Sequence, residues 1–218
     1  MKWAGFACTL GQNKRNTPAG VFLFAFMCGK MGTRSMERER DMQGFELEIL
    51  NWIQAHLRCG ILDAVMPAVS WICNHGEVWI LLAAVLLAMP KTRKAGACLA
   101  CGLVLDLLLC NLWLKPWIGR VRPFAVNPGI QLLIAPPTDA SFPSGHTAAS
   151  FAAVAALRTA RSPLWKPSLV LAAVIAFSRL YLYAHWPTDI LGGILVGTLA
   201  GWLGAKLVQL LAKKGEKN

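Results

Sequence analysis

The stretch Ala95–Trp117, AGACLACGLVLDLLLCNLWLKPW, decides the fold class of this chain. Its apolar part, Ala95–Leu114, matches the roughly 20 residues that an α-helix needs to cross a hydrocarbon core. Other apolar runs lie at Val78–Met89, Thr147–Leu157, Pro167–Phe177 and Ile190–Leu211. In a chain of 218 residues that is 56% hydrophobic, these runs predict an all-α, polytopic transmembrane helical bundle of five to six spans.

The placement of basic residues predicts how this bundle is oriented. The net charge is +11, and three basic clusters fall in short connections or at the chain end: Lys91, Arg93 and Lys94; Arg158, Arg161 and Lys166; and Lys213, Lys214 and Lys217. The positive-inside rule assigns such clusters to the cytoplasmic side of the plasma membrane. No basic stripe is interleaved with aromatic residues, so nucleic acid is not an expected partner, whereas membrane lipids are. The oligomeric state is not predicted.

The N-terminal part differs in composition from the rest. Residues 1–41 are predicted to be a flexible leader or the product of a start codon placed too early, and 42–218 to be the membrane-embedded domain. Phe45–Leu57 has the apolar face of an amphipathic helix lying along the membrane interface. Beyond it, the apolar run Leu62–Cys73 is interrupted by Asn74–Glu77, which leaves open one kinked span or two shorter elements.

The second half of the chain predicts a polar loop and three helices. The loop covers residues 118–143, and the helices cover roughly 144–160, 165–186 and 188–212. Counting the crossings places this loop and the turn near His185 on one face, opposite the basic clusters and therefore extracytoplasmic. Asp106 lies inside an apolar run, where an ionisable group is costly. A hydrogen bond between helices is the preferred interpretation of Asp106, and a role in a site is the alternative.

Three polar clusters lie on the predicted extracytoplasmic face. They are Lys115–Pro123 (KPWIGRVRP), Pro143–His146 (PSGH) and Ser178–Asp189 (SRLYLYAHWPTD). The first and third supply the cations Lys115, Arg122 and Arg179, which suit phosphate oxygens. The second opens a helix, whose free backbone N–H groups favour an anion. In it, Ser144 adds a hydroxyl donor and Gly145 allows close approach of the backbone. Together these features predict a phosphate site.

Two of the four histidines fall within these clusters and indicate the reaction. Asp189 lies in the first turn of the helix that Pro187 should begin, where its carboxylate can accept a bond from one ring nitrogen of His185. The other nitrogen would then be free to attack phosphorus, and His146 would protonate the departing oxygen. Arg120 lies outside this spacing and is interpreted as a side chain that reaches lipid headgroups.

The three motifs together resemble the type-2 phosphatidic-acid phosphatase superfamily. Its pattern is Lys-x6-Arg-Pro, then Pro-Ser-Gly-His, then Ser-Arg-x5-His-x3-Asp, and all three parts are complete here across residues 45–212. The resemblance implies hydrolysis through a phosphohistidine, without metal or other cofactor. His185 would be the nucleophile, Asp189 its orienting partner and His146 the general acid. The phosphate-binding residues would be Lys115, Arg122, Ser144, Gly145 and Arg179.

The resemblance leaves several functions open. Short bacterial members often resemble undecaprenyl-diphosphate phosphatases, so hydrolysis of undecaprenyl diphosphate to undecaprenyl phosphate, a step of cell wall biogenesis, is the preferred prediction. A phosphatidic acid or phosphatidylglycerol phosphate phosphatase would use the same chemistry. A protein that only binds lipid phosphate is the alternative of another class, although binding alone requires neither His185 nor Asp189. Vanadate-dependent haloperoxidases share the motifs but have soluble architectures, which the apolar runs argue against.

Overall fold

The computed structural model describes residues 41–215, and every regular element within that range is helical. This confirms the all-α class. The proposed leader over 1–41 lies almost wholly outside the described residues, so it stays a prediction. The described residues up to Phe45 and the chain from Glu46 onward belong to two separate compact units. The second unit holds all three polar clusters.

The helices follow the sequence in most places. They are residues 41–56, α2 (Gly60–Trp71), α3 (Glu77–Ala88), α4 (Arg93–Asp106), the π-helix η1 (Leu107–Leu114), α5 (Lys115–Ile118), α6 (Pro123–Val126), α7 (Gly145–Thr159), α8 (Trp165–Tyr181) and α9 (Pro187–Gly215). The segment α4–η1–α5 is the long helix expected over Ala95–Trp117. The break before Glu77 makes α2 and α3 two shorter helices, with Gly76 at a φ of 79°. The expected end of α8 near residue 186 is wrong, because α8 ends at Tyr181.

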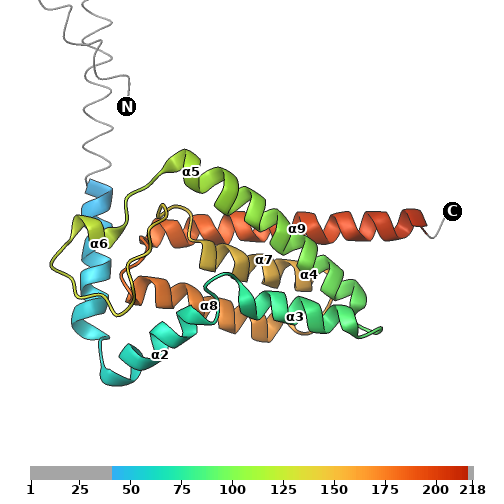
Figure 1. Ribbon diagram of the computed structural model, residues 1–218, viewed down its shortest axis with the longest axis horizontal. Helices are drawn as coiled ribbons and strands as arrows, with labels where there is room; N and C mark the ends of the chain where they lie inside the picture. The colour runs from blue at the N-terminus through green and yellow to red at the C-terminus, as the bar shows by residue number, and fades with distance from the viewer. Residues whose placement is uncertain (1–40, 216–218) are drawn as a thin grey trace, which may run out of the picture. The chain divides into compact units, whose positions relative to one another are not determined.

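Helix α7 is central to the bundle and contacts α4, α8 and α9. Figure 1 shows it running between α8 and α9. A Cβ atom added to Gly197 would lie 2.0 Å from the carbonyl oxygen of Ala148, and one added to Gly201 would lie 2.1 Å from that of Ala152. Small residues four positions apart therefore let the two backbones touch, as is common between membrane helices. This contact brings the start of α9 beside the start of α7, where the N–H of Ser144 donates to the backbone oxygen of Asp189 (3.1 Å).

Part of the bundle surface is strongly apolar. Within the described residues, two stretches are long and apolar enough to cross a membrane, Arg93–Val126 and Pro187–Lys214. On α9 the side chains of Leu191, Leu195 and Leu199 recur every four residues and are 59%, 72% and 51% exposed. A continuous row of exposed leucines on one helix face suits contact with lipid rather than water. The total of five to six spans stays a prediction.

Within the second unit, the helical residues 46–56 turn polar side chains toward the end of α8 and the start of α9. From Glu46 onward, Glu46 accepts a hydrogen bond from the backbone N–H of Thr188 (2.8 Å), and Gln54 donates to the backbone oxygen of Tyr181 (2.7 Å). Between them, the side chain of Asn51 accepts from the Tyr183 hydroxyl (2.8 Å). This helix is therefore tied to the segment that joins α8 and α9. That it lies along a membrane interface stays a prediction.

Candidate active site

The three polar clusters meet at one cavity of about 1510 Å³. Six of the eight predicted site residues line it: Lys115, Arg122, Gly145, His146, Arg179 and His185. The other two, Ser144 and Asp189, are fully buried and do not line the cavity. The three clusters, which are distant in the chain, thus lie together, as expected from counting the membrane crossings.

The end of α8 directs His185 to the cavity. The N–H of Tyr183 donates to the oxygen of Leu180 (3.0 Å), and the N–H of Ala184 donates to the oxygen of Arg179 (3.1 Å). This is a Schellman motif, whose left-handed residue is usually glycine. Here that residue is Tyr183, with a φ of 56°. A non-glycine residue in this conformation costs about 1–2 kcal/mol, and the buried tyrosine hydroxyl, which Asn127 also binds (3.0 Å), helps to offset it.

His185 and Asp189 form the geometry expected of a nucleophile and its orienting partner. Nδ1 of His185 lies 3.4 Å from Oδ2 of Asp189. This is longer than the usual N–H···O distance of about 2.7–3.2 Å, as is common for catalytic contacts in ligand-free enzymes. Oδ2 of Asp189 is held by the Ser141 hydroxyl and by the N–H of Trp186 (2.8 Å). The other ring nitrogen, Nε2, lies 3.2 Å from Nη1 of Arg122, at the cavity side.

The environment of His185 favours a neutral ring. Burial lowers the pKa of the imidazole to about 3; Asp189 opposes this shift, while the positive charges of Arg179 and Arg122 add to it. A neutral imidazole with its proton on Nδ1, facing Asp189, keeps a lone pair on Nε2; this nitrogen accepts a hydrogen bond from Nη1 of Arg122 (3.2 Å), and the lone pair can attack phosphorus once Arg122 turns to a phosphate oxygen. The geometry therefore suits nucleophilic attack from Nε2.

The cations of the cavity are already engaged by an acidic residue that the sequence analysis did not assign to the site. Asp139 accepts hydrogen bonds from Lys115 and, at 2.7 Å, from Nη2 of Arg122. Partial burial would raise the pKa of Asp139, but these two cations outweigh it and lower the pKa to about 2. Arg179 donates to the Ser70 hydroxyl, while its Nε has no hydrogen-bond partner among the described residues.

The start of α7 presents backbone donors to the same cavity. Ser144 is the N-cap and Gly145 the first helical residue. A Cβ added to Gly145 would lie 3.0 Å from Oδ1 of Asn111 and 3.6 Å from Nζ of Lys115. Glycine therefore keeps this helix end open beside a cation, which suits an anion. The ring of His146 also lines the cavity, and its buried Nε2 has no partner within residues 41–215.

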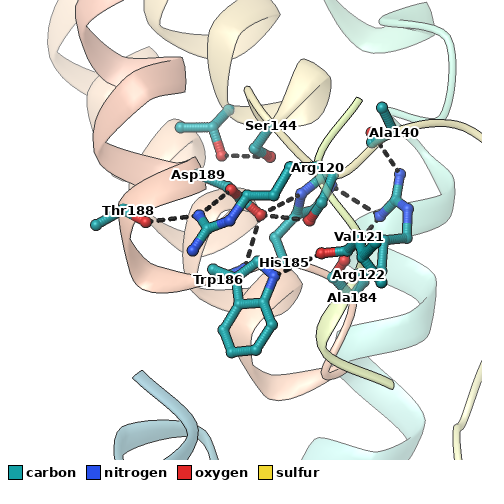
Figure 2. Close-up of polar contacts among 12 residues, drawn as sticks. Arg120, Val121, Arg122, Ala140, Ser144, Ala184, His185, Trp186, Thr188 and Asp189 are labelled. Atoms are coloured by element: carbon teal, nitrogen blue, oxygen red, sulfur yellow. Dashed lines mark hydrogen bonds and ion pairs between the residues drawn. The ribbon is translucent and has the colours of Figure 1, made fainter. Parts of the chain in front are cut away.

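Two interpretations from the sequence are corrected. Arg120 does not extend to lipid headgroups: its Nη1 lies 2.6 Å from Oδ1 of Asp189 (Figure 2). Its Nη2 lies 2.5 Å from Oε2 of Glu46. Oδ1 of Asp106 is buried without a hydrogen-bond partner in the described part of the chain, so the preferred bond between helices is not found. Asp106 instead lines the cavity.

The sequence analysis also missed Glu46, Ser141 and the role of Asp139. Each lies outside the three motifs and contacts a residue that is not its neighbour in the chain. The local sequence therefore does not identify it as part of the site. One indication was available for Arg120, which shares the short segment Arg120–Arg122 with a predicted phosphate ligand.

Comparisons with known proteins identify the family and the fold of this chain. The family model of the PAP2 superfamily matches residues 95–213. The undecaprenyl-diphosphatase of Sulfolobus acidocaldarius is 33% identical over 86% of this chain and 89% of its own length. The undecaprenyl-diphosphatase BcrC of Bacillus subtilis is 30% identical over 69% of this chain and 77% of its own. The crystal structure of Aquifex aeolicus LpxE superposes with a TM-score of 0.63 at 26% identity, covering 73% of this chain and 94% of LpxE.

Proposed function

Because the chain belongs to the PAP2 superfamily and is a membrane lipid phosphatase, we propose that it hydrolyses undecaprenyl diphosphate to undecaprenyl phosphate through a phosphohistidine at His185. The observation that carries this proposal is the position of His185. Its Nε2 faces a cavity that three cations share, and Asp189 lies behind its Nδ1.

The proposed reaction has two steps. In the first, Nε2 of His185 attacks the terminal phosphorus, and the bond from that phosphorus to the bridging oxygen breaks. Lys115, Arg122 and Arg179 stabilise charge on the phosphoryl oxygens, as donors do in other phosphoryl transfers. The proton on Nδ1 stays with the ring, held toward Asp189, as the ring becomes positively charged.

His146 completes each step as a proton carrier. We assign to it the proton that the bridging oxygen of the departing undecaprenyl phosphate takes up. Its Nε2 is buried at the cavity without a protein partner in the described range. In the second step it takes a proton from the water that attacks phosphohistidine, which releases inorganic phosphate and restores His185. No step calls for a metal ion, because the three side-chain cations supply the positive charge.

We choose undecaprenyl diphosphate as the preferred substrate because of the relatives of this chain. Two proteins similar to most of this chain are named undecaprenyl-diphosphatases, which favours a polyprenyl diphosphate. A phosphatidic acid or phosphatidylglycerol phosphate phosphatase is the second candidate, because the phosphate-binding motifs are the same for all of these substrates. The cavity reaches between α2, α3 and α4, where apolar side chains such as Ile80 and Leu103 could contact a lipid chain.

We further propose that the site faces the extracytoplasmic side. Helices α7 and α9 both begin at the site and run away from it to Arg158 and Lys213, which belong to two of the basic clusters. The third cluster lies just before α4 and in its first turn, at the end of α4 far from Lys115. Since basic residues favour the cytoplasmic side, the opposite end of the bundle would hold the site.

The test is phosphate release by the full chain in detergent with a chelator present. Undecaprenyl diphosphate and phosphatidic acid are offered in parallel, and we expect faster release from the diphosphate and inhibition by vanadate. His185→Ala should abolish release and the acid-labile phosphoprotein formed by rapid quenching. His56→Ala, which removes an exposed imidazole that does not line the cavity, is the matched control.

Three outcomes would contradict parts of this proposal. Faster release from phosphatidic acid would assign the second candidate. Undiminished release by His185→Ala would exclude this nucleophile, and loss of release on adding the chelator would exclude a mechanism without metal.

A further inference from the structure

Arg120 lies on the opposite side of Asp189 from the histidine. Nη1 of Arg120 donates to Oδ1 of Asp189 at 2.6 Å, while Oδ2 faces His185. Asp189 is fully buried, and the side chain of Arg120 is 19% exposed. Figure 2 shows the guanidinium group of Arg120 directed at Asp189 and Thr188. A buried carboxylate in this position needs a cation, because unpaired charges in the protein interior are costly.

Three further contacts hold Arg120 in place. Nη2 of Arg120 binds Oε2 of Glu46 at 2.5 Å, and Nη1 also donates to the Thr188 hydroxyl at 2.6 Å. The guanidinium carbon lies 5.1 Å from the centre of the Trp186 ring, within the range of a cation–π contact. Glu46 is 4% exposed, so the two carboxylates and the guanidinium form one nearly buried group.

The segment Arg120–Arg122 places one arginine beside each member of the His185–Asp189 pair. The left-handed Gly119 (φ 61°) ends α5, and the backbone of Arg122 is extended. Residues two apart in an extended chain point to the same side. Arg120 accordingly contacts Asp189, and Arg122 contacts Nε2 of His185. The carbonyl oxygen of Val121 between them accepts a bond from the Trp186 ring at 2.8 Å, which keeps the segment in register.

We infer that Arg120 is a positioning residue for catalysis, which holds the Asp189 carboxylate toward His185 and is itself held by Glu46 of the first helix. This inference rests on the proposed function, because it concerns the same nucleophile. Arg120 is absent from the cavity lining and therefore does not bind phosphate directly. Its loss should slow attack by His185 without weakening substrate binding.

The loss of Arg120 would act on Asp189 rather than on the ring of His185, because other cations lie beside the ring. Arg122 and Arg179 act on the ring of His185, and Arg120 is the cation in contact with Asp189 within residues 41–215. In Arg120→Gln, Asp189 and Glu46 would both lose this cation. We therefore expect a loss of stability together with a loss of positioning. A second change, Glu46→Gln, removes one of the two carboxylate charges that lack a cation. It should therefore restore stability without restoring the position of Asp189.

The experiment compares Arg120→Gln, Arg120→Lys and Glu46→Gln/Arg120→Gln with the unaltered full chain. Turnover of undecaprenyl diphosphate and of phosphatidic acid is divided by the number of vanadate-binding sites, so that unfolded protein is not counted. A displacement of about 1 Å can reduce turnover about 100-fold. We expect Arg120→Gln to lower kcat by about 10- to 100-fold, with KM within about twofold. Arg120→Lys should retain part of the activity, because lysine keeps the charge but not the fork to two carboxylates.

The double variant distinguishes positioning from stability. We expect Glu46→Gln/Arg120→Gln to recover much of the Tm while kcat stays low. Recovery of kcat together with Tm would overturn the inference, and so would an unchanged kcat in Arg120→Gln. Arg58→Gln, which breaks the ion pair with Asp63 outside this group, is the matched control and should leave kcat unchanged. If the unaltered protein releases phosphate from neither lipid, the proposed function fails and this inference fails with it.

Discussion

Replacing Asp139 by asparagine should strengthen substrate binding. The Asp139 carboxylate bridges Lys115 and Arg122, the two cations that we assign to the phosphate. An incoming phosphate has to displace this carboxylate before it can bind both cations. The Asp139→Asn change would keep the size of the side chain and the backbone contact of residue 139 with Arg122, but it would remove the competing charge.

The size of the effect follows from the ion pairs. A pKa lowered from 3.8 to about 2 corresponds to roughly 2.5 kcal/mol of net stabilisation of the charged carboxylate, after burial has opposed the effect of the two cations. The side chain of Asp139 is 52% exposed, so solvent screening reduces this to about 1 kcal/mol. Because the pKa is depressed, the ion pairs are complete above pH 3.8 and are lost as the pH falls through about 2. At neutral pH the whole effect is present, and about 1 kcal/mol corresponds to about a fivefold change in affinity.

The assay is the KM for undecaprenyl diphosphate together with the inhibition constant of vanadate, both at low and high salt. For Asp139→Asn we expect both constants to fall about fivefold at low salt and less at high salt, because salt screens exposed charges. Asp63→Asn, which removes a carboxylate paired with Arg58 and absent from the cavity lining, is the control. A KM that rises in Asp139→Asn would refute the reasoning, since it would mean that Asp139 orients the two cations rather than competing for them.

Two further predictions concern the scaffold of the site. Gly197→Ala should lower the Tm by several degrees, because its Cβ would lie 2.0 Å from a backbone oxygen of α7 and overpacking costs about 1–3 kcal/mol. Gly60→Ala, where a Cβ meets no atom within 4 Å, is its control, and equal Tm values for the two variants would contradict the close contact. Tyr183→Phe should cost about 1–2 kcal/mol, because Asn51 and Asn127 lose their buried partner. Thermal unfolding in detergent measures this loss, and an unchanged Tm would mean that the hydroxyl does not stabilise the turn.

The sequence by itself predicted the helical fold and six of the residues that line the cavity. Apolar runs long enough to cross a membrane appear directly in the chain, and α4–η1–α5 follows Ala95–Trp117 closely. The motif residues were found for a related reason. Each motif is short and local, so a few neighbouring side chains indicate its chemistry. Examples are PSGH at a helix start and His185 four residues before Asp189.

Helix ends and solitary polar residues were predicted less well. The end of α8 was placed near 186 because Pro187 was taken as the stop, whereas a Schellman motif with Tyr183 ends the helix at Tyr181. Tyrosine rarely takes a left-handed conformation, so nothing in the local sequence indicated that turn. For Asp106 a hydrogen bond between helices was preferred, with a role in a site as the alternative, because its surroundings depend on where the cavity opens between α2, α3 and α4.

Only the tertiary structure decided which charged side chains form ion pairs at the site. Arg120 meets Glu46 and Asp189 across 74 and 69 residues, and Asp139 meets Lys115 across 24. Such pairs depend on how closely the helices approach, which is set by contacts such as that of Gly197 with Ala148. The sequence determined which side chains could bind and cleave a phosphate ester. Packing determined which cations line the cavity and which one contacts Asp189, because an ion pair forms only between groups that the fold brings within a few ångströms.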